Sequence, residues 1–240
     1  MTADLLFLPL GVAAGAVTQR VTGVGFALVA APLLVLATGA FDGIILANVL
    51  SLLVGVVVLA RTWRDVEWRR GILLAVPALA VVPLGAFVAR SVPAPVLLVV
   101  TGTIVLLALG LVQLGPRTAV LHGTTGAVGA GAASGFMNVT AGVGGPAMVL
   151  YAVSTRWEHH RFVATFQFYA VLVNLASLAT KGPPHLPPSA LAVSVGALGV
   201  GLLLGELLSR RVPADRASRA VVVLAMAGAL ATVVKGVVAL

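Results

Sequence analysis

Two short polar segments rich in glycine interrupt long apolar stretches of this chain, and they carry the residues best suited to chemistry. The first covers residues 18–25 and the second covers residues 138–146. Both contain Gly-Val-Gly, and Gly142 follows Gly23 by 119 positions. Glycine lets a backbone adopt positive φ and approach a ligand closely. Neither segment holds a convincing nucleophile, a pair of carboxylates or a set of metal ligands, so the sequence predicts a binding site rather than an enzyme.

Arg20 is the one charged residue in these two segments. An arginine at the bilayer centre costs at least about 2.5 kcal/mol on insertion scales, so its side chain should face protein, water or a ligand. We interpret Arg20 as the counter-charge for an anion. The alternative is a structural role, with the guanidinium bound to a carbonyl or extended toward the interface. Val139 occupies the equivalent position in the second segment, so the site would be asymmetric.

Neutral polar residues recur at the same spacing. The 119-residue offset also pairs Gln19 with Asn138 and Asn48 with Gln167. These amides could donate hydrogen bonds to an anion or join one helix to another. A helix that starts after each segment would add unpaired backbone N–H groups, which favour anions. The predicted substrate-binding residues are Gln19, Arg20, Thr22, Gly23, Gly25, Asn48, Asn138, Thr140, Gly142, Gly144, Gly145 and Gln167.

The composition indicates that the bilayer is the solvent of this protein. Its 240 residues are 60% hydrophobic and only 9% charged, and the mean hydropathy is +1.13. A soluble domain of this size could not bury so much apolar surface. The net charge of +8 lies in short clusters between apolar runs, where it sets membrane orientation, so we predict no nucleic-acid partner. Cysteine is absent, and we predict neither a metal nor a cofactor.

The apolar runs occur in the same order in both halves. A broken stretch comes first in each half, at residues 5–38 and 119–153. Unbroken runs near the length of about 20 residues needed to cross the hydrocarbon core follow them. These runs cover residues 44–60, 71–89, 96–114, 162–180, 189–209 and 220–240.

The broken stretches have the wrong length for simple crossings. As one helix, residues 5–38 would be about 50 Å long, against a core of about 30 Å. The two limbs, residues 5–17 and 24–38, would each reach roughly 20 Å and could form a hairpin that enters the membrane and returns. If both stretches crossed instead, the basic residues would divide almost evenly between the two sides.

With two re-entrant hairpins, the basic residues collect on one side. The other side keeps only Arg90, Lys181 and Lys235. The positive-inside rule then places the basic loops in the cytoplasm and both termini outside. The predicted cytoplasmic loops are residues 61–70, 115–118, 154–161 and 210–219.

These patterns predict an all-α polytopic membrane protein with about eight hydrophobic segments. Each half would contain a broken, re-entrant helical hairpin and three transmembrane helices. Because three crossings per half is an odd number, the second half would be inverted relative to the first. We therefore expect one membrane domain over residues 1–240, made of repeat 1 (1–118) and repeat 2 (119–240).

The glycine-rich segments carry a family resemblance. Residues 15–32, with Gly23-Val24-Gly25 and Pro32, and residues 135–146 resemble the two motifs of the sulfite exporter TauE/SafE family. The resemblance covers the whole chain. It implies a transporter of the cell membrane that exports sulfite or an organosulfonate such as sulfoacetate.

The leading functional hypothesis is a secondary transporter that exports a small anion by alternating access. A passive anion channel and a non-transporting membrane partner are the alternatives. Glu206 lies four residues before Arg210, which favours a helical ion pair over a proton carrier. The expected partners are a small anion and the lipid bilayer, with a homo-oligomer as a further possibility.

Overall fold

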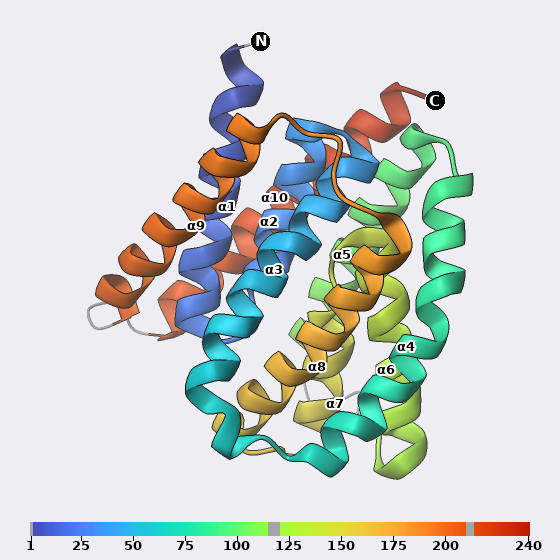
Figure 1. Cartoon of the computed structure of the whole chain (residues 1–240), viewed down its shortest axis with the longest axis vertical. Helices are drawn as coiled ribbons and strands as arrows, with labels where there is room; N and C mark the ends of the chain where they lie inside the picture. Colours follow the sequence, from blue (N-terminus) through green and yellow to red (C-terminus); the bar gives the residue numbers. More distant parts are fainter. Residues whose placement is uncertain (1, 115–120, 210–213) are drawn as a thin grey trace.

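The protein is built from helices packed side by side (Figure 1). A computed structural model describes residues 2–114, 121–209 and 214–240, and these residues contain no strand. The helices are α1 (Thr2–Thr22), α2 (Phe26–Thr38), α3 (Ala40–Thr62), α4 (Trp68–Ser91), α5 (Ala94–Leu114), α6 (Gly123–Ala141), α7 (Gly145–Ser154), α8 (His159–Lys181), α9 (Pro188–Ser209) and α10 (Ala214–Val238). A short 3-10 turn, Trp63–Asp65, follows α3. The predicted all-α class is confirmed.

Several of these helices suit a bilayer. Within the described residues, α4, α8, α9 and α3 with its following turn are long and apolar enough to cross a membrane. Four predicted runs, at residues 44–60, 71–89, 162–180 and 189–209, fall inside these four helices. Large apolar side chains such as Phe87 and Leu203 are exposed on the outside, as expected where lipid replaces water.

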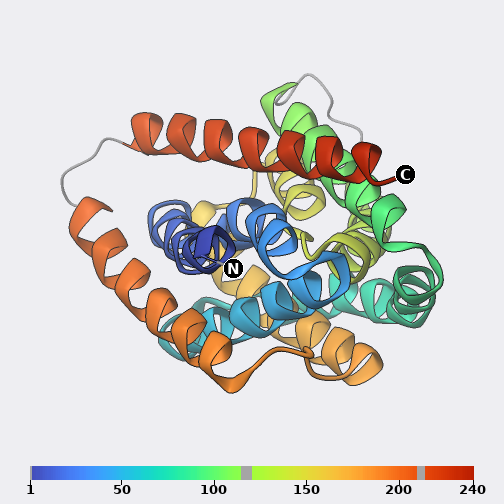
Figure 2. The same ribbon diagram turned by 90° about the horizontal axis from the view of Figure 1, so that it is seen from above.

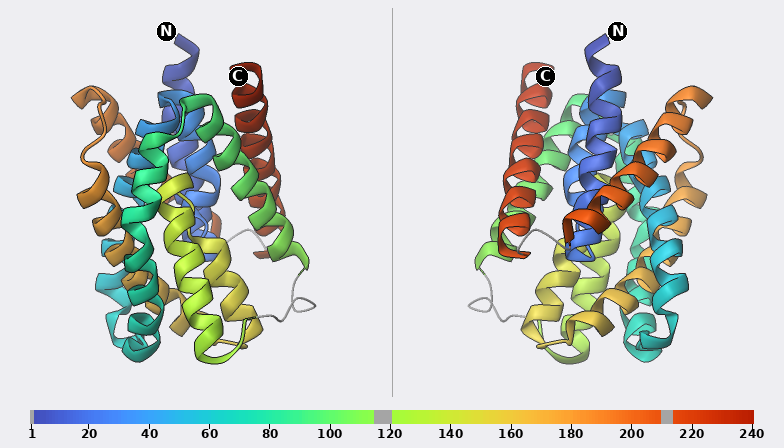
Figure 3. Two further views of the ribbon diagram at one scale, coloured as in Figure 1. Left: turned by 90° about the vertical axis from the view of Figure 1, so that its right-hand side faces the viewer. Right: turned by 90° about the vertical axis from the view of Figure 1, so that its left-hand side faces the viewer.

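Each broken stretch forms a helical hairpin. In Figure 1, α1 runs down from the N-terminus and α2 returns upward, whereas α6 rises from the lower end and α7 returns to it. Figure 3 shows the same opposed directions from both sides. The two chain termini lie at the same end of the molecule.

The first hairpin differs from its prediction in the length of α1. The first limb was expected at residues 5–17, but α1 continues through Thr22. The hydroxyls of Thr18 and Thr22 donate to carbonyls four residues earlier, at 2.8 and 2.9 Å, so these polar residues remain helical. Gly23 then ends the helix with a φ of 81°. The limb is therefore about 30 Å long rather than 20 Å.

Close approach of backbones joins helices from different parts of the chain. A Cβ added at Gly131 of α6 would lie 2.3 Å from the Leu74 carbonyl oxygen of α4. A Cβ at Gly201 of α9 would lie 2.6 Å from the Ala13 carbonyl oxygen of α1. Small residues allow membrane helices to pack at this distance. Figure 2 shows α9 and α10 flanking the more central α1 and α2.

Candidate functional site

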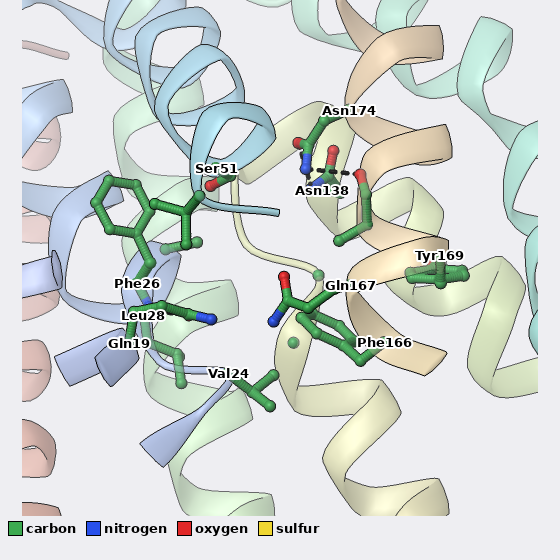
Figure 4. Close-up of a pocket in the computed structure, with 15 residues that line it drawn as sticks. Gln19, Val24, Phe26, Leu28, Ser51, Asn138, Phe166, Gln167, Tyr169 and Asn174 are labelled. Carbon is green, nitrogen blue, oxygen red and sulfur yellow. Dashed lines mark hydrogen bonds between the residues drawn. The ribbon is translucent and has the colours of Figure 1, made fainter. Parts of the chain in front are cut away.

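The tips of the two hairpins meet inside the bundle. As predicted, new helices begin beside Gly25 and Gly145: α2 starts at Phe26 and α7 at Gly145. A Cβ at Gly145 would lie 3.4 Å from the Val24 carbonyl oxygen, which places the tips in contact. A cavity of about 40 Å³ lies between these tips, α3 and α8 (Figure 4). A buried water needs about 10–15 Å³ of such volume, so the cavity holds only a few waters.

The lining of this cavity, called here the central pocket, combines apolar walls with uncharged polar groups. Apolar walls come from Val24, Leu28 and Phe166, among other residues. None of the described residues that line it carries a charge. Its polar lining consists of Gln19, Ser51, Asn138, Gln167, Tyr169 and Asn174.

Two glutamine amides converge at the centre of the pocket. Nε2 of Gln19 and Nε2 of Gln167 both donate to the Gly23 carbonyl oxygen, at 2.7 and 2.9 Å. The Gln19 Oε1 atom accepts the Phe26 backbone N–H at 3.1 Å, which fixes the orientation of this amide. Each NH₂ group has two hydrogens, so each keeps one beyond its bond to Gly23. Figure 4 shows the two nitrogens facing each other, an arrangement suited to an electron-rich ligand.

Three asparagines form a buried cluster beside the glutamines. Asn48 Nδ2 donates to Oδ1 of Asn138 at 2.7 Å and to Oδ1 of Asn174 at 2.8 Å. Asn138 Nδ2 also donates to Asn174 Oδ1, at 3.2 Å. Asn138 and Asn174 line the central pocket, whereas Asn48 does not. The cluster therefore joins α3, α6 and α8 at the pocket wall.

A buried cation adjoins this cluster. Lys181, the last residue of α8, is only 3% exposed. Its Nζ atom donates to Asn48 Oδ1 at 3.2 Å and to the Val139 carbonyl oxygen at 3.0 Å. Sequence reasoning placed Lys181 in a loop and did not include it in the site. Its spacing of seven from Asn174 could have identified it, because residues seven apart share a helix face.

Arg20 lies outside the central pocket in this structure. Its guanidinium forms an ion pair with Glu206 of α9, and the two side chains are 45% and 35% exposed. Because Arg20 already has a carboxylate partner, we do not include it in the site proposed below. Arg210, the partner predicted for Glu206, lies outside the described residues.

The remaining predicted residues occupy different positions. Gly144 and Gly145 line the central pocket. Thr22 and Gly25 line a second cavity instead. The Thr140 hydroxyl donates to a carbonyl of its own helix at 2.7 Å and faces neither cavity.

Gly142 has a structural position at the end of α6. It adopts a φ of 73° and ends the helix, with its N–H bound to the Asn138 carbonyl oxygen at 2.9 Å. Positive φ is costly for other residue types, which explains glycine at this turn.

The second cavity has a volume of about 320 Å³ and is called here the lower cavity. Val24 and Leu28 line both it and the central pocket, so these side chains separate the two spaces. Arg156 and His159, at the connection between α7 and α8, lie in its wall. The lower cavity therefore extends from the central pocket toward the lower end of the molecule in Figure 1.

The long apolar helices and the apolar side chains exposed on the outside identify the class as a multi-pass membrane protein. The model of the sulfite exporter TauE/SafE family matches residues 7–232, and the chain belongs to this family of membrane transporters. The family resemblance predicted from the glycine-rich segments is confirmed. No curated protein and no solved structure matches the chain. Members of the family are transporters rather than enzymes.

Proposed function

We propose that this protein is a secondary transporter that exports a small anion, with sulfite as the first substrate to test and sulfoacetate as the second. The convergence of the Gln19 and Gln167 NH₂ groups in an uncharged pocket is the observation that carries this proposal. Amide N–H donors held in a low-dielectric space stabilise negative oxygen atoms. The small volume favours a compact anion in this conformation.

The proposed mechanism is alternating access by two inverted repeats within one domain, residues 1–118 and 119–240. The 119-residue offset relates Gln19 to Asn138 and Gln167 to Asn48. The observed pairing of Gln19 with Gln167 at Gly23 thus has its equivalent in the bond between Asn138 and Asn48. The close packing of α1 with α9 likewise has its equivalent in α6 with α4. Both relations support a two-fold axis through the site, as in other inverted-repeat transporters.

We further propose that the lower cavity is the cytoplasmic entrance and that the protein lies in the plasma membrane with about eight hydrophobic segments. The basic loops at residues 61–70 and 154–161 lie at the lower end of Figure 1. The positive-inside rule assigns that end to the cytoplasm. On this orientation both chain termini face outside.

Single cysteines test this orientation, because the chain has no cysteine of its own. We expect Thr124→Cys and His160→Cys to react with a membrane-impermeant maleimide only from the cytoplasmic side. Ser91→Cys should react only from outside. All three residues are exposed in the structure. Labelling of positions 124 and 160 from opposite sides would show that residues 119–153 cross the membrane and would overturn the re-entrant hairpin.

Replacement of Gln167 by leucine tests the central pocket. The variant loses the free amide hydrogen together with the bond to Gly23. A hydrogen bond to a charged group contributes about 1.5–3 kcal/mol, so the half-saturating sulfite concentration should rise about 10-fold to 100-fold. Counterflow of radiolabelled sulfite in proteoliposomes measures this value. Thermal unfolding of the purified protein provides a second measurement of binding. Sulfite should stabilise the protein saturably, whereas neutral dimethyl sulfone should not.

Thr38→Val is the matched control, because the Thr38 hydroxyl donates only within α2, to Leu34 at 2.9 Å, and lies outside the central pocket. This variant should transport sulfite with unchanged half-saturation. If sulfite flux through the parent protein does not saturate and shows no counterflow, the protein is a passive channel. If no anion is bound or moved, the non-transporting partner hypothesis replaces the transporter.

A further inference from the structure

One face of α8 carries four polar residues between the central pocket and the end of the helix. Gln167, Asn174, Ser177 and Lys181 follow one another at spacings of seven, three and four residues, which places them on the same side. The helical rise separates Gln167 from Lys181 by roughly 20 Å. The central pocket occupies one end of this face, and Lys181 occupies the other.

The charge of Lys181 is unbalanced. Its two acceptors, Asn48 Oδ1 and the Val139 carbonyl oxygen, are neutral, and no carboxylate in the described part of the chain forms an ion pair with it. The nearby Arg90 is also positive and donates to the Thr180 carbonyl oxygen. A buried charge is costly unless an opposite charge compensates for it. Lys181 and Arg90 therefore place two positive groups at this end of the α8 polar face.

An unsatisfied hydroxyl lies one turn before Lys181. Ser177 is fully buried, and its Oγ atom has no hydrogen-bond partner within the described residues. Buried polar atoms in proteins are nearly always hydrogen-bonded, so such an exception calls for a water or a ligand. A hydroxyl and an ammonium group separated by one helical turn could both donate to one anion.

A third cavity lies beside the last turn of α4 and the first turn of α5, and Lys181 is not among its lining residues. Its volume is about 190 Å³, and Phe41, Arg90 and Leu97 contribute to its wall. Arg90 is near the end of α4, which lies at the end of the molecule that carries both chain termini (Figure 1). This third cavity thus lies toward the upper end of the molecule, whereas the lower cavity lies toward the lower end. We call this one the upper cavity.

We propose that Lys181 and Ser177 form a second anion-binding position, which the anion occupies after it leaves the two glutamines and before it reaches the upper cavity. This inference rests on the proposed anion transport. The central pocket binds the anion through neutral amides when it faces the lower cavity. Opening of the Asn48–Asn138–Asn174 cluster then exposes the anion to the Lys181 ammonium. Arg90 attracts it onward from the wall of the upper cavity.

Replacement of Lys181 by glutamine distinguishes the second anion-binding position from the central pocket. Sulfite uptake is measured in membrane vesicles of both orientations. In right-side-out vesicles, the half-saturating sulfite concentration should rise at least about 10-fold, because a charge-assisted hydrogen bond is lost. In inside-out vesicles it should change less than about threefold, since Gln19 and Gln167 bind from that face. Lys181→Arg retains the positive charge, so its half-saturating sulfite concentration should match that of the parent protein in both kinds of vesicle.

Lys235→Gln is the matched control, because Lys235 is another lysine near the same end and is exposed, with its Nζ atom bound to the Leu36 carbonyl oxygen at 2.9 Å. Lys235→Gln should leave the half-saturating sulfite concentration unchanged in both vesicle orientations. If Lys181→Gln does not fold, Lys181→Cys replaces it. The cysteine is then modified with aminoethyl methanethiosulfonate, which restores a positive charge, or with methyl methanethiosulfonate, which adds a neutral group. Only the charged adduct should recover the affinity at the outer face.

If Lys181→Gln and the parent protein have equal half-saturating sulfite concentrations in right-side-out vesicles, Lys181 has a structural role. The proposal of a second anion-binding position is then overturned. An equal loss of sulfite affinity in both vesicle orientations would also overturn the proposal, because Lys181 would then act on the central pocket itself. A failure of the proposed function looks different from either result. In that case the unmodified protein shows no saturable sulfite transport at either face.

Discussion

Replacing Gly131 by alanine will destabilise the protein by about 3 kcal/mol, near the upper end of the cost of overpacking a core. The added Cβ would lie 2.3 Å from the Leu74 carbonyl oxygen and 3.0 Å from Pro77 Cγ. A backbone carbonyl cannot move aside as a flexible side chain can, so α4 and α6 must separate. Thermal unfolding of the purified protein in detergent micelles measures the loss, which should appear as a lowered Tm.

Gly129 offers a control two residues away on the same helix. A Cβ there would meet nothing nearer than Leu121 Cδ2 at 4.0 Å. Gly129→Ala should therefore keep the stability of the parent protein or raise it by up to about 1 kcal/mol through better helix propensity. Equal Tm values for the two variants would contradict the close contact of α4 with α6.

The second large effect is expected for Asn48→Leu. The side chain has similar size but loses three hydrogen bonds, two donated to Asn138 and Asn174 and one accepted from Lys181. Each neutral bond contributes about 1 kcal/mol, and a buried group left without a partner costs about 1–3 kcal/mol more. The total loss should be on the order of 4 kcal/mol. Unfolding by sodium dodecyl sulfate from lipid bicelles provides the measurement.

Ser51→Ala is the comparison for this variant, because Ser51 lies one turn further along α3. Its buried hydroxyl has no hydrogen-bond partner in the described part of the structure. Removal of this group should change the unfolding free energy by less than about 0.5 kcal/mol. If Asn48→Leu is as mild as Ser51→Ala, the asparagine cluster does not hold α3, α6 and α8 together.

The sequence was informative where local chemistry decides the structure. Gly23 and Gly142 marked the helix ends because positive φ at those turns favours glycine over other residues. The apolar runs marked four long helices because hydrocarbon permits few charges across about 20 residues. The limb before Gly23 was predicted too short, because the mostly polar residues 18–22 were assigned to the interruption between the two limbs. The hydroxyls of Thr18 and Thr22 instead bond within α1, which lets the helix continue.

The site was less predictable because it depends on contacts between distant residues. Gln19 and Gln167 were both expected to bind substrate, but nothing local shows that both amides bond to one carbonyl. Arg20 appeared to need an anion because its partner, Glu206, is 186 residues away in the chain. Lys181 stands before a Gly-Pro-Pro sequence and was assigned to a loop. Its burial follows from the packing of α3 and α6 against α8.

The two close helix pairs also constrain how the protein is made. The two close contacts, α1 with α9 and α4 with α6, each join a helix to one synthesised later. When the ribosome has completed α5, α1 can pack against α2, but neither α9 nor α6 is available yet. The first half must wait in the membrane with these surfaces facing lipid or an insertion factor. The contact of α1 with α9 can therefore form only after Ser209 has been synthesised, and a chain truncated before α9 lacks it.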